Sequence, residues 1–196
     1  KLMALRVGLF GGTFDPVHIG HLAAARSFLN SGLLSELWIL LAPFPPHKNS
    51  ATQASYSHRL EMLKTAFSGF EKTKILTIEN ELPQPSYTYR TLKHLKSVYP
   101  DKDFYFCIGE DSLEHFHTWM KYDKILEETD LLVTKRPGAS HKKVLSHILN
   151  QSYFVEHEPI KVASSDIKER LKNGKSISNL VPEKVEVIIR ERGLYC

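Results

Sequence analysis

The chain has 196 residues and a hydrophobic fraction of 42%, which suits one globular domain with a substantial core. Its 26 Lys and Arg against 22 Asp and Glu give a formal net charge of only +4, too weak a bias for a dedicated nucleic-acid binder. No apolar run approaches the length of a membrane span and no charged-then-apolar leader opens the chain, so we expect neither membrane nor nucleic-acid partners.

The cysteine content favours a reducing compartment. Cys107 and Cys196 are too few for a disulfide framework, and Cys107 lies inside an apolar run. We therefore predict a cytoplasmic protein. The composition leaves a homo-oligomer open.

The predicted elements alternate along the chain between short apolar runs and longer helical segments. The run at residues 5–10 ends at two glycines and predicts a buried strand, and Gly32 predicts the end of the next helix. We predict further strands at residues 36–42, 74–78, 103–109, 129–138 and 153–156. We predict helices at residues 19–30, 56–67, 89–98, 165–172 and 182–192.

This alternation is typical of βαβ units around a parallel sheet. We predict a doubly wound, Rossmann-like α/β fold with a small helical C-terminal part, in a single domain over residues 1–196. Ligands of such sheets bind outside the carboxyl ends of the strands. Clusters of glycine, proline, histidine or lysine follow predicted strands at residues 11–21, 45–48, 109–111 and 135–138.

The first of these clusters has the features of a phosphate site. Gly11 and Gly12 follow the first strand and permit close approach to the backbone. Asp15 and Pro16 predict a helix start, with Asp15 as N-cap, whose free N–H groups and dipole suit an anion. His18 and His21 are three residues apart, so we expect them to share a face and donate hydrogen bonds to phosphate oxygens. The plainer alternative is a strand-to-helix turn with two incidental histidines.

A metal site is the other specific possibility for this cluster. The two histidines do not have the i, i+4 spacing of a zinc-binding helix, and no cysteine cluster accompanies them. We therefore predict no protein metal site.

The stretch GGTFDPVHIGH at residues 11–21 resembles the N-terminal signature of the nucleotidyltransferase superfamily, whose H-x-G-H core is shared with class I aminoacyl-tRNA synthetases. The whole stretch is most similar to the bacterial nicotinate-nucleotide adenylyltransferase family. A synthetase is not expected, since 196 residues leave no room for a tRNA-binding domain. Further similarity follows in the family's order at PPHK (45–48), PSYT (85–88), GED (109–111), Trp119, RPG (136–138) and SSDIK (164–168).

The resemblance implies a reaction and a site. ATP and nicotinate mononucleotide would give nicotinate adenine dinucleotide and pyrophosphate, with His18 and His21 as catalytic donors and Mg²⁺ carried mainly by the ATP phosphates. It implies that ATP and its phosphates are bound by Gly11, Gly12, Thr13, Phe14, Lys48, Gly109, Asp111, Arg136, Ser164, Ser165 and Lys168. It implies that nicotinate mononucleotide is bound by Tyr87, Thr88, Trp119 and Met120.

Several of these positions have a plain structural alternative. Lys48 follows two prolines that would stiffen its loop, yet it could be a solvated lysine. Trp119 could stack on the pyridine ring or belong to the core. Ser164 or Ser165 could serve only as the N-cap of a helix.

The sequence departs from the family at two site positions. Glu110 replaces a small residue beside Asp111, and its role is left unassigned. Lys168 replaces an arginine, which keeps the charge but loses the bidentate fork. Other phosphate acceptors, such as nicotinamide mononucleotide or phosphopantetheine, and a catalytically inactive nucleotide sensor are the alternatives. The intact histidines argue against a sensor.

Overall fold

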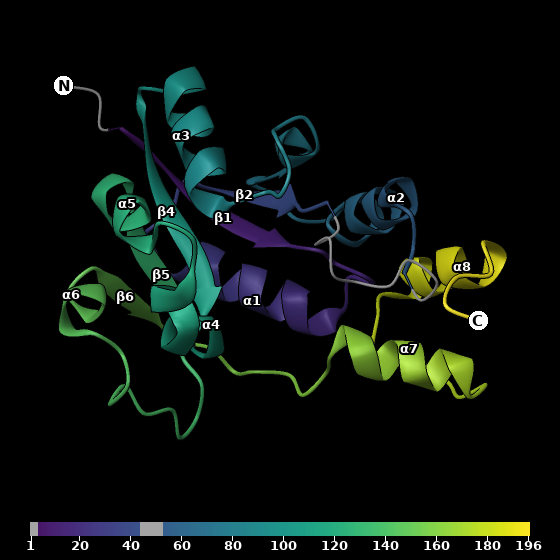
Figure 1. Ribbon diagram of the computed structural model, residues 1–196. Helices are drawn as coiled ribbons and strands as arrows, with labels where there is room; N and C mark the ends of the chain where they lie inside the picture. The colour runs from purple at the N-terminus through teal and green to yellow at the C-terminus, as the bar shows by residue number, and fades with distance from the viewer. Residues whose placement is uncertain (1–3, 44–52) are drawn as a thin grey trace.

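The computed structural model describes residues 4–43 and 53–196 (Figure 1). Its strands are β1 (Leu5–Gly12), β2 (Glu36–Leu41), β3 (Thr73–Leu76), β4 (Lys102–Gly109), β5 (Asp130–Thr134) and β6 (Ser152–Val155). Its α-helices are α1 (Ile19–Asn30), α2 (Tyr56–Ala66), α3 (Thr88–Val98), α4 (Glu110–His115), α5 (Tyr122–Glu128), α6 (Ser146–Leu149), α7 (Ser164–Lys172) and α8 (Glu183–Glu191). Two short 3₁₀ helices are η2 (Ile78–Asn80) and η3 (Phe116–Thr118).

The strands form one parallel sheet in the order β3-β2-β1-β4-β5-β6. This is the order of a doubly wound sheet, in which the chain winds outward from a central strand in both directions. The predicted fold class is therefore confirmed. The adjacent strands β1 and β4 lie at the centre, so the loops that follow them meet at the middle of the carboxyl edge.

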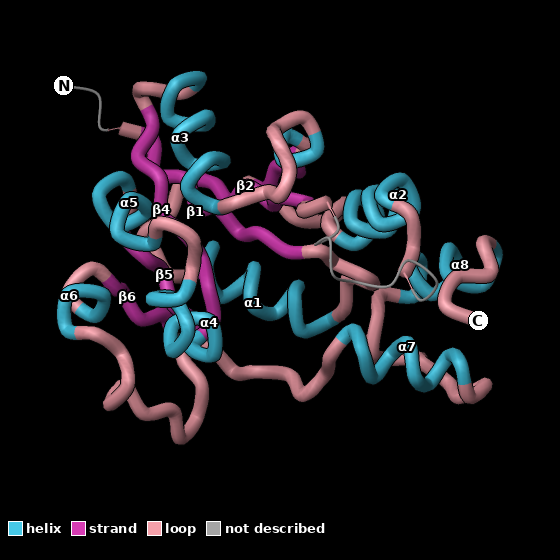
Figure 2. Tube along the Cα trace, in the orientation of Figure 1, coloured by secondary structure: helices cyan, strands magenta, loops and turns pink. Residues whose placement is uncertain are grey.

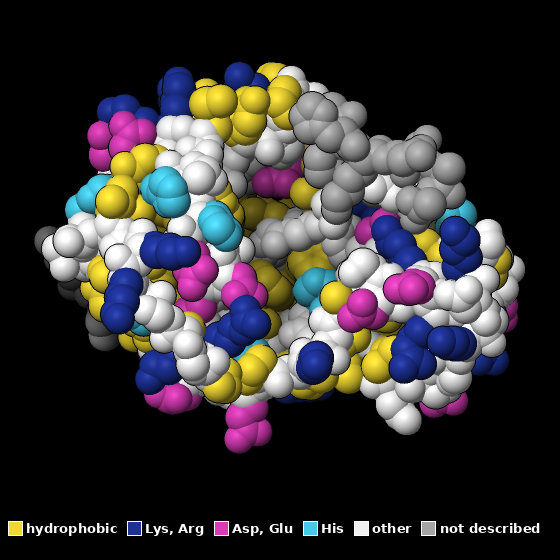
Figure 3. Space-filling model, turned by 60° about the horizontal axis from the view of Figure 1, so that its bottom comes forward, with side chains coloured by type: hydrophobic (Ala, Val, Ile, Leu, Met, Phe, Trp, Pro, Cys, Tyr) yellow, Lys and Arg dark blue, Asp and Glu magenta, His cyan; other side chains and the backbone are white. Residues whose placement is uncertain are grey.

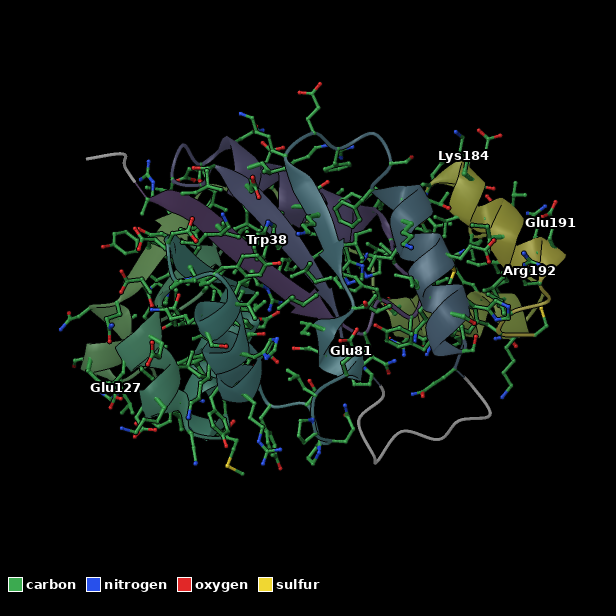
Figure 4. The ribbon with its side chains drawn as sticks, turned by 90° about the horizontal axis from the view of Figure 1, so that it is seen from above. Trp38, Glu81, Glu127, Lys184, Glu191 and Arg192 are labelled. Atoms are coloured by element: carbon green, nitrogen blue, oxygen red, sulfur yellow. The ribbon has the colours of Figure 1, made fainter. Side chains whose placement is uncertain are left out.

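Alternation along the strands fills two cores. In β2, Leu37, Ile39 and Leu41 face the core shared with α1, α2, α7 and α8. Trp38 and Leu40 face the other core, shared with α3, α4 and α5. Figure 4 shows Trp38 projecting from the sheet on the side covered by α3. Burial on both faces explains why the predicted strands read as apolar runs.

The C-terminal helices pack on one of these cores. Ile167 of α7 and Val185 and Ile189 of α8 belong to the same buried cluster as Phe28 of α1. Figure 2 shows the loop after β6 running past α1 to reach α7. The predicted helical C-terminal part is therefore present and lies against the α1 side of the sheet.

The short helices were not predicted. No element was predicted where α4, α5 and α6 lie, and these helices have only 6, 7 and 4 residues. Elements of this length have too few turns for an apolar period and owe their stability to tertiary packing. The predicted strand at 129–138 is shorter in the structure, where β5 ends at Thr134, and the chain then turns at Gly138, whose φ is 74°.

Two further observations bear on the expectations from composition. Cys107 is buried, Cys196 is exposed, and both are free thiols. Over residues 4–43 and 53–196, no helix is both long and apolar enough to cross a membrane.

Candidate active site

A cavity of about 440 Å³ lies at the carboxyl edge of the sheet. It is bounded by the exits of β4 and β5 and by the segment that leads into α7. Figure 3 shows this face of the molecule hollowed at its centre, with charged side chains around the hollow and a histidine inside it. The residues that line the cavity include Gly109, Glu110, Asp111, Thr134, Lys135, Arg136, His157, Ala163 and Asp166.

His18 and His21 form a stacked pair at the start of α1. Their ring centroids are 3.7 Å apart and the rings are inclined by 22°. His18 is the N-cap of α1, and its Nδ1 accepts a hydrogen bond of 3.1 Å from the N–H of Gly20. The Nδ1 of His21 accepts a bond of 3.1 Å from the N–H of His18. We call residues 13–21 the histidine turn.

These bonds fix the protonation of both rings. A ring nitrogen that accepts a backbone N–H carries no proton, so each neutral imidazole has its proton on Nε2. Burial lowers the pKa of His18 to about 4. Burial, and secondly the neighbouring His18, lowers the pKa of His21 well below its usual value. At neutral pH the turn therefore presents two neutral Nε2–H donors.

The predicted range of this helix, 19–30, matches α1, but its predicted capping residue was wrong. Asp15 is not the N-cap, because α1 begins at Ile19 and His18 takes the cap position. The predicted free N–H groups of the first turn are also absent. The N–H of Ile19 donates to Leu180 O at 3.0 Å, that of Gly20 to the His18 ring, and that of His21 to His18 O at 3.0 Å. The donors that α1 offers to an anion are therefore the two imidazoles.

Gly20 is required by the shape of this pair. A Cβ at this position would lie 2.9 Å and 3.0 Å from His18 ring atoms and 3.0 Å from Val162 Cγ1. Gly12 is similarly confined by the Phe14 ring, at 3.1 Å. Gly11 has only ordinary contacts, the nearest at 3.9 Å. Gly11 and Gly12 are the last two residues of β1, and the left-handed conformation occurs instead at Phe14, whose φ is 45°.

Thr13 and Phe14 carry the turn from the sheet to the histidines. Phe14 is 2% exposed and its ring meets the His21 ring edge-on at 4.9 Å, so its side chain belongs to the core. The carbonyl of Thr13 accepts a hydrogen bond of 2.8 Å from Arg59 Nη1, which also donates to Ala42 O at 2.8 Å. Arg59 is fully buried and thus brings a positive charge beneath the turn.

Asp15 is a buried anchor. It is 4% exposed and accepts hydrogen bonds from Ala54 N–H at 3.1 Å, from the Tyr195 hydroxyl at 2.6 Å and from Lys168 Nζ. A buried carboxylate is tolerated only when its oxygens are paired in this way. The local pattern predicts a capping role for Asp15, whereas its partners come from across the chain.

The side of the cavity at the exits of β4 and β5 is organised by the residues after Gly109. Asp111 forms an ion pair with the Arg136 side chain across the mouth of the cavity. Glu110 is 6% exposed and accepts from the Arg136 backbone N–H and from His141 Nε2, the latter at 2.6 Å. Glu110 therefore points into the protein and ties down the loop after β5, with both of its carboxylate oxygens hydrogen-bonded.

The SSDIK segment forms the start of α7. The predicted serine N-cap was wrong, because Ala163 takes that position and Ser164 Oγ donates to Pro16 O at 3.0 Å. Ser165 is exposed. The first N–H groups of α7 have no intrahelical acceptors. This helix can therefore donate backbone hydrogen bonds to an anion, which α1 cannot do. Lys168 lies one turn further along α7, and its Nζ forms an ion pair with the Asp15 carboxylate.

The residues expected to bind the pyridine nucleotide lie in two adjoining segments. Tyr87 is the N-cap of α3 and Thr88 its first residue. Trp119 is partly buried and packs edge-on against Phe106, with centroids 5.7 Å apart. Met120 is 48% exposed. Lys121 Nζ lies 4.7 Å from the centroid of the Tyr89 ring, which brings the two segments together.

Two expectations stay predictions. Lys48, expected to bind phosphate, lies outside the described residues. Among the residues that are described, no group of three His, Cys, Asp or Glu side chains could hold a metal ion. The absence of a protein metal site from the whole chain therefore stays a prediction as well.

Sequence reasoning missed the residues that hold the site together. Arg59 and Tyr195 support the histidine turn, His141 binds Glu110, and His157 lines the cavity with its Nδ1 2.8 Å from Ser27 Oγ. None has a spacing that indicates a role. Their partners are between 17 and 180 residues away, so no local pattern could have found them.

A doubly wound sheet with paired histidines at its first strand exit defines a nucleotidyltransferase. The family model described as cytidylyltransferase-like matches residues 9–170. Solved structures share the fold: the Plasmodium falciparum nicotinic acid mononucleotide adenylyltransferase complexed with NaAD has a TM-score of 0.77 at 21% identity, covering 97% of each chain.

The chain belongs to the nicotinate-nucleotide adenylyltransferase family. It is 37% identical over 190 residues to the nicotinate-nucleotide adenylyltransferase of Bacillus subtilis, which covers 97% of this chain and 98% of that protein. It is 41% identical to the probable nicotinate-nucleotide adenylyltransferase of Geobacillus thermodenitrificans, over 97% of this chain and 86% of that protein. It is thus a nucleotidyltransferase by family, as predicted.

Proposed function

We propose that this protein transfers the adenylyl group of ATP to nicotinate mononucleotide, giving nicotinate adenine dinucleotide and pyrophosphate. The observation that carries the proposal is the stacked pair His18 and His21, which holds two Nε2–H donors at the exit of β1. Family membership supplies the substrate class. The two free cysteines fit a cytoplasmic site of action.

The chemistry needs little from a base or nucleophile of the protein. A phosphate oxygen of nicotinate mononucleotide attacks the α-phosphorus of ATP in line, and the bond from that phosphorus to the bridging oxygen breaks. The acceptor is already an anion, so positioning and charge stabilisation supply the catalysis. Mg²⁺ bound to the phosphates would neutralise part of the charge on the leaving pyrophosphate. The described carboxylates Asp15 and Asp111 are both paired with cations, which fits a metal that arrives on ATP.

The histidines would act on the charge that develops in the transition state. Two neutral Nε2–H donors can hydrogen-bond phosphate oxygens without a proton transfer. Because each Nδ1 is already engaged by the backbone, the donors are oriented before ATP binds and need no reorganisation. The α7 N-terminus with Ser165, and Lys168 after release from Asp15, would bind the remaining phosphate charge.

The nucleoside and acceptor would lie on either side of this pair. Gly109, Asp111 and Arg136 border the cavity that would take the adenosine, and a carboxylate at a strand exit suits ribose hydroxyls. Trp119 would stack on the pyridine ring, while N–H groups near Thr88 and Met120 would bind the nicotinate carboxylate.

The test is a pyrophosphate-release assay with ATP and a panel of acceptors. Nicotinate mononucleotide, nicotinamide mononucleotide and phosphopantetheine are compared at equal concentrations, with the His18→Ala/His21→Ala double variant as control. Preference for nicotinate mononucleotide is the expected result. Preference for phosphopantetheine would assign the protein to another acceptor. If none of the three acceptors supports pyrophosphate release, none of these functions holds.

A further inference from the structure

The C-terminal part of the chain contacts the histidine turn at Asp15, Pro16 and Ile19. The contacts are Ser164 Oγ to Pro16 O at 3.0 Å, Ile19 N–H to Leu180 O at 3.0 Å, Lys168 Nζ to Asp15, and the Tyr195 hydroxyl to Asp15 at 2.6 Å. The contacts of Ser164 and Lys168 come from the segment that would bind phosphate. The contact of Tyr195 does not.

The Asp15 carboxylate divides its oxygens between these partners. Oδ1 accepts from Ala54 N–H and from the Tyr195 hydroxyl, and Oδ2 accepts from Lys168. Burial, and secondly the hydrogen bond to Asp15, raises the pKa of Tyr195, so its hydroxyl remains a donor. If Lys168 turns toward phosphate, Oδ2 loses its cation while Oδ1 keeps both donors.

The backbone around Tyr195 is held in place by contacts with α8, the core and α2. After α8 the chain reverses through Gly193, whose φ is 59°, and Tyr195 itself has a φ of 65°. Leu194 N–H donates to Ile189 O at 2.9 Å, and the Leu194 side chain is in the core. Arg192 pairs with Glu61 of α2 at 3.3 Å, and Figure 4 shows Arg192 at the C-terminal end of α8. The contacts of Leu194 and Arg192 thus hold the backbone beside Tyr195 in place independently of the bond between Tyr195 and Asp15.

Movement of Asp15 would reach the histidines directly. Only Pro16 and Val17 separate Asp15 from His18, and Val17 is fully buried, so the short segment has little freedom to absorb a shift. His18 in turn donates its N–H to the His21 ring and caps α1 with its own ring. A displaced Asp15 would therefore misplace both Nε2–H donors.

We propose that Tyr195 is a positioning residue for adenylyl transfer: through Asp15 Oδ1 its hydroxyl holds the histidine turn in place while Lys168 engages phosphate. This inference rests on the proposed function. Tyr195 does not touch substrate in this role. It keeps one oxygen of Asp15 occupied during the part of the cycle in which the other oxygen is released.

Tyr195→Phe tests the proposal because it removes the hydroxyl and keeps the ring. We expect kcat to fall about tenfold, with KM for ATP and for nicotinate mononucleotide each within about twofold, since a small misplacement acts on the transition state. Tyr153→Phe is the matched control, because Tyr153 is 48% exposed on the edge strand β6. It should leave kcat unchanged.

A second measurement does not depend on turnover. Long-range ¹H–¹⁵N correlation spectra of the imidazoles report which ring nitrogen carries the proton. In the unsubstituted protein His18 and His21 should each show an unprotonated Nδ1. Tyr195→Phe should shift these resonances or mix the two tautomers, whereas Tyr153→Phe should not.

The outcomes separate the two proposals. If the unsubstituted protein releases no pyrophosphate, the proposed function fails and the imidazole spectra alone decide the role of Tyr195. A lower melting temperature with kcat and spectra unchanged would reduce Tyr195 to a structural residue and overturn the inference. A raised KM for ATP with kcat intact would also overturn it, because Tyr195 would then act on ATP binding.

Discussion

The His18 ring caps the helix that carries His21, and the His21 ring accepts the backbone N–H of His18. The two side chains are therefore mutually oriented by main-chain bonds on their Nδ1 atoms, and within residues 4–43 and 53–196 neither Nε2–H group has a hydrogen-bond partner. This reciprocal arrangement makes the pair a preorganised double donor, and it sets the following expectations.

Removal of either donor should slow the reaction without abolishing binding. We expect His18→Ala and His21→Ala each to lower kcat by roughly two to three orders of magnitude, the size of effect typical for one charge-stabilising donor. Steady-state pyrophosphate release measures this. His94→Ala on α3 serves as the control, and near-normal turnover in a folded His21→Ala protein would remove the proposed mechanism.

Addition of one methyl group at Gly20 should act on the same rings. Gly20→Ala would place its Cβ 2.9 Å from the His18 ring, so the ring must move or the helix start must shift. We expect at least about a tenfold loss of kcat. Gly69→Ala is the matched control, because a Cβ there meets nothing within 4 Å. Equal kcat for the two variants would contradict a steric requirement for Gly20.

Stability should fall in mild acid because His18 is held neutral. The unfolded imidazole takes up a proton near pH 6.5, whereas burial lowers the pKa in the folded protein to about 4. The unfolded state then binds more protons in this interval, so the stability contribution is full above pH 6.5 and declines as the pH falls toward 4. The decline has an upper limit of roughly 3 kcal/mol.

Denaturant titrations between these pH values measure this decline. His18→Asn is the informative variant, since asparagine is a good N-cap but does not titrate. Its pH slope should be shallower than that of the unsubstituted protein. Identical slopes would show that His18 is not the group responsible.

Lys168 should tolerate arginine and not alanine. Lys168→Arg keeps the charge beside Asp15 and adds a planar fork, so we expect equal or slightly better use of ATP. Lys168→Ala should raise KM for ATP and lower stability, because it also leaves the buried Asp15 without its cation. Lys172→Ala at the exposed end of α7 is the control. Unchanged KM and kcat in Lys168→Ala would show that this lysine does not reach the triphosphate.

The acceptor pocket should distinguish nicotinate from nicotinamide mononucleotide. N–H donors that suit two carboxylate oxygens would face an NH₂ group in the amide, and each unpaired buried group costs about 1–3 kcal/mol. We expect kcat/KM to differ by about a hundredfold or more. Comparable values for the two acceptors would leave Tyr87, Thr88 and Trp119 with structural roles only.

Much of the fold could be predicted because apolar runs and helix signals are local. The strand at residues 5–10, the helix at 19–30 and its stop at Gly32 need only neighbouring residues, and the structure has them nearly as expected. The short helix α4 could not be predicted, because its six residues owe their conformation to packing against the sheet.

In the candidate site too, residues with a local signal could be predicted, and residues whose roles depend on distant partners could not. His18 and His21 stand out in the sequence because they share one turn with glycines. The roles of Asp15 and Glu110 depend on Tyr195 and His141, which are 180 and 31 residues away. Local rules therefore assign Asp15 a capping role that His18 performs, and leave Glu110 without one.

The bond between Asp15 and Tyr195 also has a consequence for the order of events during synthesis. The histidine turn leaves the ribosome early, but a partner that fixes it is encoded 180 positions later. At elongation rates of about 5–20 residues per second, seconds pass between the two. A nascent chain can form β1, α1 and β2 in that time, yet its reactive turn stays unsecured. Catalytic competence would therefore arrive only after the last residues of α8 and Tyr195 have been added to the chain.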